Sequence, residues 1–256
     1  MLPFPARDPW APPLQAMTAL PDLGAVRVVL REYLDAAPAA EAARGIELFL
    51  RRGLDGHAGA QRALLGLALL LIEEDVAGRC ELRSRLREGA LAEGCAAVAA
   101  ILAEGPARRS LAPRGRLREI GIGEDALLPA IGAVPQERLR HTTRIERLRL
   151  HASPRMIARL LRQRWVRLDD VLRVAARRPT TGALLAQVAM SGWGHRVEVR
   201  EAVVLNPFAS ATLSLPLLPT VRRKALARLR GAGAQAAIGE AAGELLALRG
   251  RASCGR

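Results

Sequence analysis

Apolar residues recur at intervals of three and four along most of the chain, a spacing that places them on one face of an α-helix. The pattern predicts a helix from Asp22 onward and further helices at about Ala39–Arg52, Gly59–Asp75, Cys80–Arg87 and Leu91–Leu102. The segment Gly59–Asp75 is apolar nearly all round. We therefore expect it at the centre of an N-terminal helical bundle, residues 22–104.

Three segments of the C-terminal half align on prolines, at intervals of 25 and 28 residues: Pro154, Pro179 and Pro207. A leucine follows six residues after each one: Leu160, Leu185 and Leu213. Proline is tolerated in the first turn of a helix and stops the preceding helix, so each proline predicts a corner between helices. Units of this kind bury their apolar faces by stacking on one another. The pattern predicts an α-solenoid of three or four short repeats.

The best-preserved corner carries the sequence Val-Arg-Glu-Ala-Val followed by Asn-Pro. This stretch resembles the leucine-rich-repeat-variant and HEAT-like class of α-solenoids, through Val199, Arg200, Ala202, Val203, Asn206 and Pro207. The longer run from Arg144 to about Leu248 is similar to uncharacterised deltaproteobacterial helical-repeat proteins. The resemblance implies a fold and carries no catalytic residues. Trp165 and Trp193, in loops between paired helices, are expected to seal the gaps between repeats.

The remaining segments set the boundaries of the domains in a protein that we predict to be all-α. Residues 1–21 are Pro-rich and predict an extended arm. Residues 105–118 combine Pro, Gly and Ser with five arginines and predict a basic linker. We therefore expect an N-terminal helical bundle at 22–104, the helical-repeat domain at 119–250, and a tail at 251–256.

Composition supports helices, since alanine and leucine make up 90 of the 256 residues and seven are aromatic. The formal net charge is +14, with 39 basic residues of which Lys224 is the only lysine. Such a preference for arginine is typical of a GC-rich genome. The charge is nevertheless uneven, with 11 basic and 14 acidic residues in 1–104 but 28 and 11 in 105–256. This asymmetry favours a polyanionic partner for the C-terminal half.

Arginines spaced by three and four predict a basic strip along successive helices of the repeat domain. Its members are Arg140, Arg144, Arg147, Arg155, Arg159, Arg162, Arg173 and Arg177. The strip fits an acidic protein surface, our first expectation, or the phosphates of DNA or RNA. A solvated face without a partner is the remaining alternative. We expect a non-enzymatic scaffold that binds a macromolecule through this strip.

An enzymatic alternative comes from Asp169 and Asp170 in the same region as Trp165 and Trp193. HEAT-like alkylpurine DNA glycosylases combine a basic concave face with tryptophans and a catalytic aspartate, which makes a DNA-repair enzyme the second alternative. Adjacent aspartates point to different helix faces, and as first-turn carboxylates they stabilise the helix dipole. The chain has no GxSxG or HExxH motif.

The sequence predicts no cofactor, no metal and no small-molecule site. The two GxGxxA strings, Gly121–Ala126 and Gly231–Ala236, do not follow a predicted strand, as a dinucleotide site requires. Cys80, Cys95 and Cys254 form no CxxC pair and predict free thiols in a reducing compartment. The longest charge-free apolar stretch, Ala63–Ile72, has ten residues, whereas a membrane span needs about 20. We expect a cytoplasmic protein without a membrane span.

Overall fold

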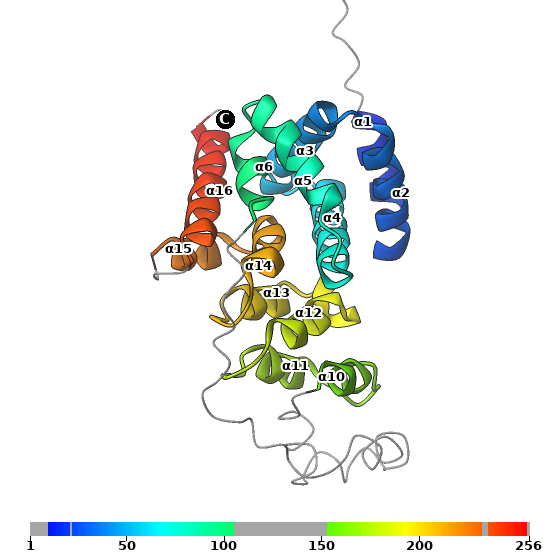
Figure 1. The fold of residues 1–256 in the computed structure, drawn as a ribbon, viewed down its shortest axis with the longest axis vertical. Coiled ribbons are helices and arrows are strands. Elements are labelled where there is room, and N and C mark those ends of the chain that lie inside the picture. Colours follow the sequence, from blue (N-terminus) through cyan, green and yellow to red (C-terminus); the bar gives the residue numbers. More distant parts are fainter. Residues whose placement is uncertain (1–9, 21, 105–152, 232–234, 255–256) are drawn as a thin grey trace, which may run out of the picture. The chain divides into compact units, whose positions relative to one another are not determined.

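The computed structural model describes residues 10–20, 22–104, 153–231 and 235–254. These residues form helices joined by turns, and no β-strand occurs among them, as the composition predicts. The chain divides into two compact units (Figure 1). Unit 1 comprises residues Met1–Glu104 and Leu215–Arg256, and unit 2 comprises Gly105–Ser214.

Unit 1 is built around a helix that is buried on nearly every side. This helix, α4 (Ala58–Val76), packs against α1, α2 and α3. The flanking helices of the unit are α1 (Ala11–Ala19), α2 (Leu23–Ala36), α3 (Ala39–Leu54), α5 (Glu81–Ala92) and α6 (Ala96–Ile101). The continuous apolar run of α4 leaves no side suited to water, which confirms its predicted central place in the N-terminal bundle.

The first helix corrects the prediction of an extended arm over residues 1–21. Residues 11–19 form α1, and its prolines lie in the first turn, where a missing backbone N–H costs nothing. Trp10 and Met17 anchor the helix, being 4 % and 0 % exposed. The Trp10 ring meets Phe49 of α3 edge to face, with ring centroids 5.5 Å apart. The burial of Trp10 and Met17 thus stabilises a helix at residues 11–19, where the proline-rich composition predicted an extended segment.

The C-terminal helices also differ from the predicted division. Residues from Leu215 onward belong to unit 1, although we expected them to end the repeat domain. They form η2 (Leu218–Thr220), α15 (Arg223–Gly231) and α16 (Ala236–Cys254). The apolar stripe of α16 packs on α6, α3 and α15, so that Ala241, Ala242 and Leu245 are fully buried. The apolar side of α16 is therefore buried against helices of unit 1.

Unit 2 contains two helix pairs that pack in two layers (Figure 1). Its described helices are α10 (Pro154–Leu161), α11 (Leu168–Ala175), α12 (Gly182–Met190), η1 (Gly192–His195) and α13 (Val197–Val204). Helix α10 packs on α12, and α11 packs on α13. Helix α14 (Ala211–Leu217) runs across the division between the units.

The prolines mark the corners only in part. Pro154 begins α10, as predicted, but α12 begins three residues after Pro179 and α14 four residues after Pro207. Capping hydroxyls decide these two starts. Thr181 Oγ1 accepts a hydrogen bond from Leu184 N at 3.2 Å, and Ser210 Oγ accepts one from Leu213 N at 3.2 Å. The expectation that Pro207 opens a helix is therefore wrong, because Pro207 lies in the preceding turn.

Candidate functional site

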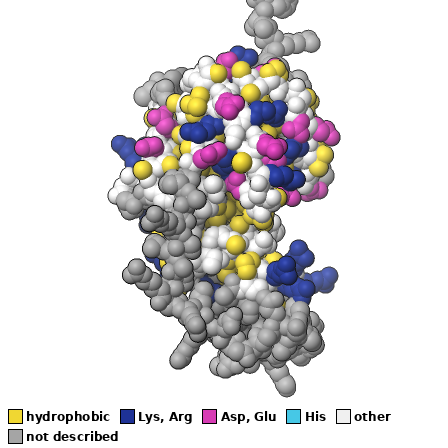
Figure 2. Space-filling model, in the orientation of Figure 1, with side chains coloured by type: hydrophobic (Ala, Val, Ile, Leu, Met, Phe, Trp, Pro, Cys, Tyr) yellow, Lys and Arg dark blue, Asp and Glu magenta, His cyan; other side chains and the backbone are white. Residues whose placement is uncertain are grey.

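Helix α10 separates an apolar side from a basic side. Met156, Ile157, Leu160 and Leu161 are buried, whereas the arginines at spacings of four and three are exposed. We call this exposed set, Arg155, Arg159 and Arg162, the arginine face. Figure 2 shows dark blue side chains gathered at α10, whereas blue and magenta alternate over the visible face of unit 1. The sequence therefore places these three arginines correctly on one side of one helix.

No acidic side chain of the described residues neutralises the arginine face. Among the described residues, no carboxylate forms an ion pair with Arg155, Arg159 or Arg162. Residues 153–214 contain ten arginines against four carboxylates. The face is consequently a local source of positive potential that an anionic surface can neutralise.

The predicted strip does not continue from this face onto the helix packed beside it. Arg140, Arg144 and Arg147 lie outside the described residues. Helix α10 packs on α12, and residues 182–190 contain no basic residue, so the row of arginines does not continue onto the helix stacked beside it. The prediction that the basic strip continues from α10 onto its stacking neighbour is therefore wrong.

The remaining two arginines belong to the other layer of unit 2. Arg173 lies on α11 and is exposed, and Arg177 follows that helix and is half-buried. Burial lowers the pKa of Arg177, which shows that its surroundings disfavour the charge. The two arginines therefore form a separate, weaker basic feature on the layer of α11 and α13.

The arginine and asparagine of the best-preserved corner are buried, and their hydrogen bonds lie inside unit 2. Arg200 Nη1 donates to Gly194 O at 2.9 Å and to His195 O at 2.7 Å. Burial lowers the pKa of Arg200, against the opposing effect of Glu198 and Glu201. Asn206 Nδ2 donates to Ala175 O at 2.8 Å and to Arg177 O at 3.0 Å. Both side chains satisfy backbone carbonyls at helix ends.

The two tryptophans of unit 2 pack rather than face a ligand. Trp165 is 7 % exposed. Trp193 is half-buried, and its Nε1 donates to Leu161 O at 3.1 Å. A base could not stack on Trp165 without opening the core, because stacking requires an accessible ring face. Asp170 Oδ2 accepts from Arg167 N at 3.0 Å, so this carboxylate caps α11.

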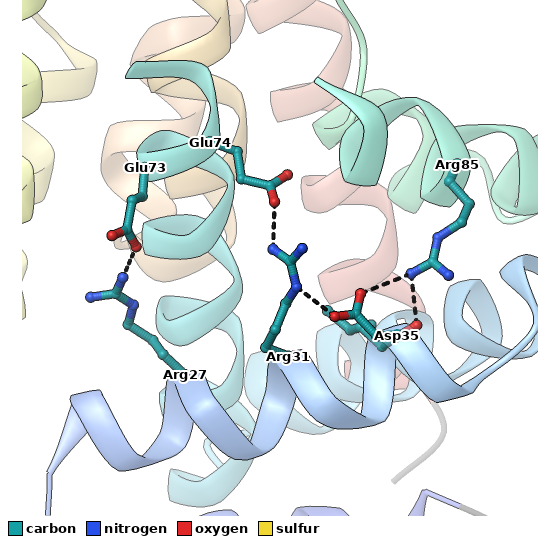
Figure 3. Close-up of polar contacts among 7 residues, drawn as sticks. Arg27, Arg31, Asp35, Glu73, Glu74 and Arg85 are labelled. Carbon is teal, nitrogen blue, oxygen red and sulfur yellow. Dashed lines mark hydrogen bonds and ion pairs between the residues drawn. The ribbon is translucent and has the colours of Figure 1, made fainter. Parts of the chain in front are cut away.

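A charged cluster in unit 1 was not predicted from the sequence (Figure 3). Arg31 donates through Nη1 to Glu74 and through Nε to Asp35 Oδ2 at 2.7 Å. Arg85 Nη2 lies 3.5 Å from Asp35 Oδ1 and donates to Leu34 O at 2.8 Å. The cluster thus joins three helices, α2, α4 and α5. The i,i+4 pair Arg31 and Asp35 is a visible sequence signal, but the partners on other helices are not.

The same cluster lines a cleft of about 390 Å³. Its walls are formed by Arg31, Asp35, Glu74, Arg79, Glu81, Leu82 and Arg85. The hydrogen bonds to Asp35 and Glu74 raise the pKa of Arg31 above its ordinary value. Three arginines and three carboxylates line the cleft, so its formal charge is zero. The hydrogen bonds and ion pairs of the cluster connect α2 with α4 and α5.

Two further features of the described residues bear on function. Their His, Cys, Asp and Glu side chains form no group of three or more that could hold a metal ion. Within the same ranges, no helix combines the length and apolarity needed to cross a membrane.

No protein-family model matches the chain, and neither a curated protein nor a solved structure shows significant similarity to it.

Proposed function

We propose that this protein is a non-enzymatic helical-repeat scaffold that binds an acidic surface of a partner protein through the arginine face of α10. The observation that carries the proposal is the set of three exposed arginines on one side of α10, without a carboxylate partner among the described residues. Guanidinium groups form bidentate hydrogen bonds with carboxylates, so three of them suit a small acidic patch.

The packing of unit 2 supports the repeat part of the proposal. Alternate helices stack, α10 on α12 and α11 on α13, as in a two-layer array of helix pairs. Asn206, at the end of the second pair, donates to the carbonyls of Ala175 and Arg177 at the end of the first pair. Such a bond repeated between neighbours holds an array in register. Together with the resemblance to HEAT-like and leucine-rich-repeat-variant solenoids, these contacts favour a short α-solenoid.

The extent of the arginine face favours a protein partner over nucleic acid. The face occupies a single helix and does not continue onto α12. A phosphate backbone that tracks across unit 2 would meet no cation on α12. A protein can place an acidic patch on α10 alone. Nucleic acid binding at this face is the competing outcome of the test.

The test compares charge reversals on and off the arginine face. Arg155→Glu with Arg159→Glu changes the charge by four units on the face, and Arg178→Glu with Arg196→Glu makes the same change at exposed sites elsewhere in unit 2. Fluorescein-labelled poly-L-glutamate serves as the defined acidic polypeptide in anisotropy titrations. We expect the first variant to bind at least about tenfold more weakly and the second to stay within about threefold of the wild type. Equal losses in both variants would contradict the proposal.

The native partner is then captured from cell extract with the full chain as bait. We expect an acidic protein that remains bound after nuclease treatment and is lost with the α10 reversal but retained with the control reversal. Capture that disappears on nuclease treatment assigns the arginine face to nucleic acid instead. Far-UV circular dichroism of each variant checks that the helices persist, since surface reversals cost little stability.

A further inference from the structure

A second basic surface lies on α15, in unit 1, outside the predicted strip. Its exposed cations are Arg222, Arg223, Lys224, Arg228 and Arg230, and the opposite side of the helix buries Ala225, Leu226 and Leu229. We call these five exposed residues the α15 basic face. It concentrates five positive charges within nine residues, over roughly 13 Å of helix.

No carboxylate balances this face within the same stretch of chain. The sequence contains no Asp or Glu between Glu201 and Glu240. Among the described residues, no ion pair joins Arg223, Lys224, Arg228 or Arg230 to an acid. This differs from α2 and α4, where Arg27 pairs with Glu73 and Arg31 with Glu74. Within the part of the chain that the structure describes, these four cations of α15 therefore have no ion-pair partner, and like charge accumulates along the helix.

The neighbouring helix adds a further cation to the same place. Arg249 of α16 donates through Nη2 to Val221 O at 3.1 Å, directly before the α15 basic face. Burial lowers the pKa of Arg249, and the nearby charge of Arg223 lowers it further. The charges of Arg223 and Arg249 repel each other, and an anion bound at the α15 basic face would lower this repulsion.

We propose that the α15 basic face binds the phosphate backbone of a nucleic acid. Double-stranded DNA carries one negative charge per about 1.7 Å of helix axis, so several phosphates can lie along the length of α15. This match in charge density favours nucleic acid over a protein surface, where carboxylates are interspersed with neutral and basic side chains. The contact needs no base-edge geometry, so the binding is sequence-independent.

A lipid surface fits the α15 basic face less well. An interfacial helix buries an apolar side in the bilayer, but the apolar side of α15 is already packed on α16. The large apolar side chains that are exposed in the described residues are Val28, Tyr33, Val76 and Leu91, none of them on α15. The inference goes beyond the proposed function, because it concerns another helix, another unit and another class of partner.

The experiment measures binding of the full chain to a fluorescein-labelled 20-base-pair DNA duplex of mixed sequence, between 50 and 200 mM salt. The test variant combines Arg223→Glu, Lys224→Glu and Arg228→Glu. The matched control combines Arg79→Glu, Arg178→Glu and Arg196→Glu, which changes the charge by the same six units at exposed sites outside α10 and α15. Circular dichroism checks that the triple Glu variant keeps its helices. If it does not, a variant with the same three residues changed to Gln replaces it in the DNA-binding titrations.

We expect the wild type to bind with an affinity that falls linearly in log salt. The α15 variant should lose at least about tenfold in affinity at 100 mM salt, and its salt slope should be shallower by about 2.7, or about 0.9 for each lost phosphate contact. The control should stay within about threefold, and it leaves the arginine face of α10 intact, so the comparison does not depend on the proposed acidic-protein site. Equal losses in both variants, unchanged DNA binding by the α15 variant, or α15-dependent uptake by anionic phosphatidylserine vesicles without DNA binding would each overturn the proposal.

Discussion

The side-chain amide of Asn206 donates to the backbone carbonyl of Ala175, 31 residues earlier in the chain, at 2.8 Å. The same nitrogen lies 3.0 Å from the carbonyl oxygen of Arg177, and Asn206 Oδ1 accepts from Phe208 N at 3.0 Å. One buried side chain therefore satisfies backbone carbonyls at the C-terminal end of α11 and accepts a hydrogen bond within the turn before α14. Asn206 therefore links two corners of unit 2.

Asn206→Ala should lower the free energy of unfolding of unit 2 by about 2–4 kcal/mol, because it leaves two carbonyls near α11 without their donor. Urea titration followed by tryptophan fluorescence measures this in a Trp10→Phe background, where Trp165 and Trp193 report on unit 2. Pro207→Ala is the matched control and should change the value by less than about 0.5 kcal/mol, since Pro207 is exposed. A variant at Asn206 with the wild-type urea midpoint would refute the linking role.

Gly89→Ala should destabilise unit 1 by about 1–3 kcal/mol, although alanine is the better helix former. A Cβ at Gly89 of α5 would lie 2.2 Å from Ala39 O at the start of α3, and a backbone carbonyl cannot move aside as a side chain can. Gly243→Ala in α16 is the control, because a Cβ there meets nothing within 4 Å. That substitution should raise stability by about 0.5–1 kcal/mol. Thermal unfolding followed by circular dichroism checks both, and a stabilising Gly89→Ala would contradict the close packing of α3 and α5.

Arg31→Gln should cost about 2–3 kcal/mol of stability, because it leaves the buried carboxylate of Glu74 without its partner. The effect is smaller than for a fully buried pair, since the Arg31 side chain is 40 % exposed. Arg27→Gln on the same helix is the control and should cost under about 1 kcal/mol, because its partner Glu73 is 53 % exposed.

A double-mutant cycle isolates the Arg31–Glu74 interaction. Glu74→Gln removes the buried charge, so the double variant with Arg31→Gln should recover part of the loss caused by Arg31→Gln alone. Urea denaturation at pH 7 provides the four free energies. Strict additivity of the two substitutions would show that the charges do not interact across α2 and α4.

Cys95 should resist modification at pH 8, whereas Cys80 reacts. Burial, with a smaller contribution from the hydrogen bond to Glu47, raises the pKa of the Cys95 thiol to about 12. Its reactive thiolate is then roughly one part in ten thousand at pH 8. In a Cys254→Ser background, a thiol-specific disulfide reagent should label one cysteine quickly, and labelling should vanish on adding Cys80→Ser. Fast labelling of Cys95 in the folded protein would contradict its burial.

The local features of the fold could be predicted from residue spacing. The all-round apolar character of α4, the two-sided character of α10 and the all-helical composition depend on neighbours within one or two turns. Such neighbours are fixed by the 3.6-residue period, so a sequence pattern predicts them directly. The arginine face follows from the same rule, since its members lie on the side of α10 opposite Ile157 and Leu160.

Only the tertiary structure decided which faces meet. The sequence predicted a helical-repeat domain up to residue 250, but the packing of α16 on α6 and α3 places this helix in unit 1. The bond from Asn206 to Ala175 and the pairing of Arg31 with Glu74 likewise join residues 31 and 43 positions apart. An amphipathic stripe requires that an apolar partner exist without specifying which one, because burial is roughly proportional to area and not to direction. The shapes and charges of surfaces distant in the chain make that choice.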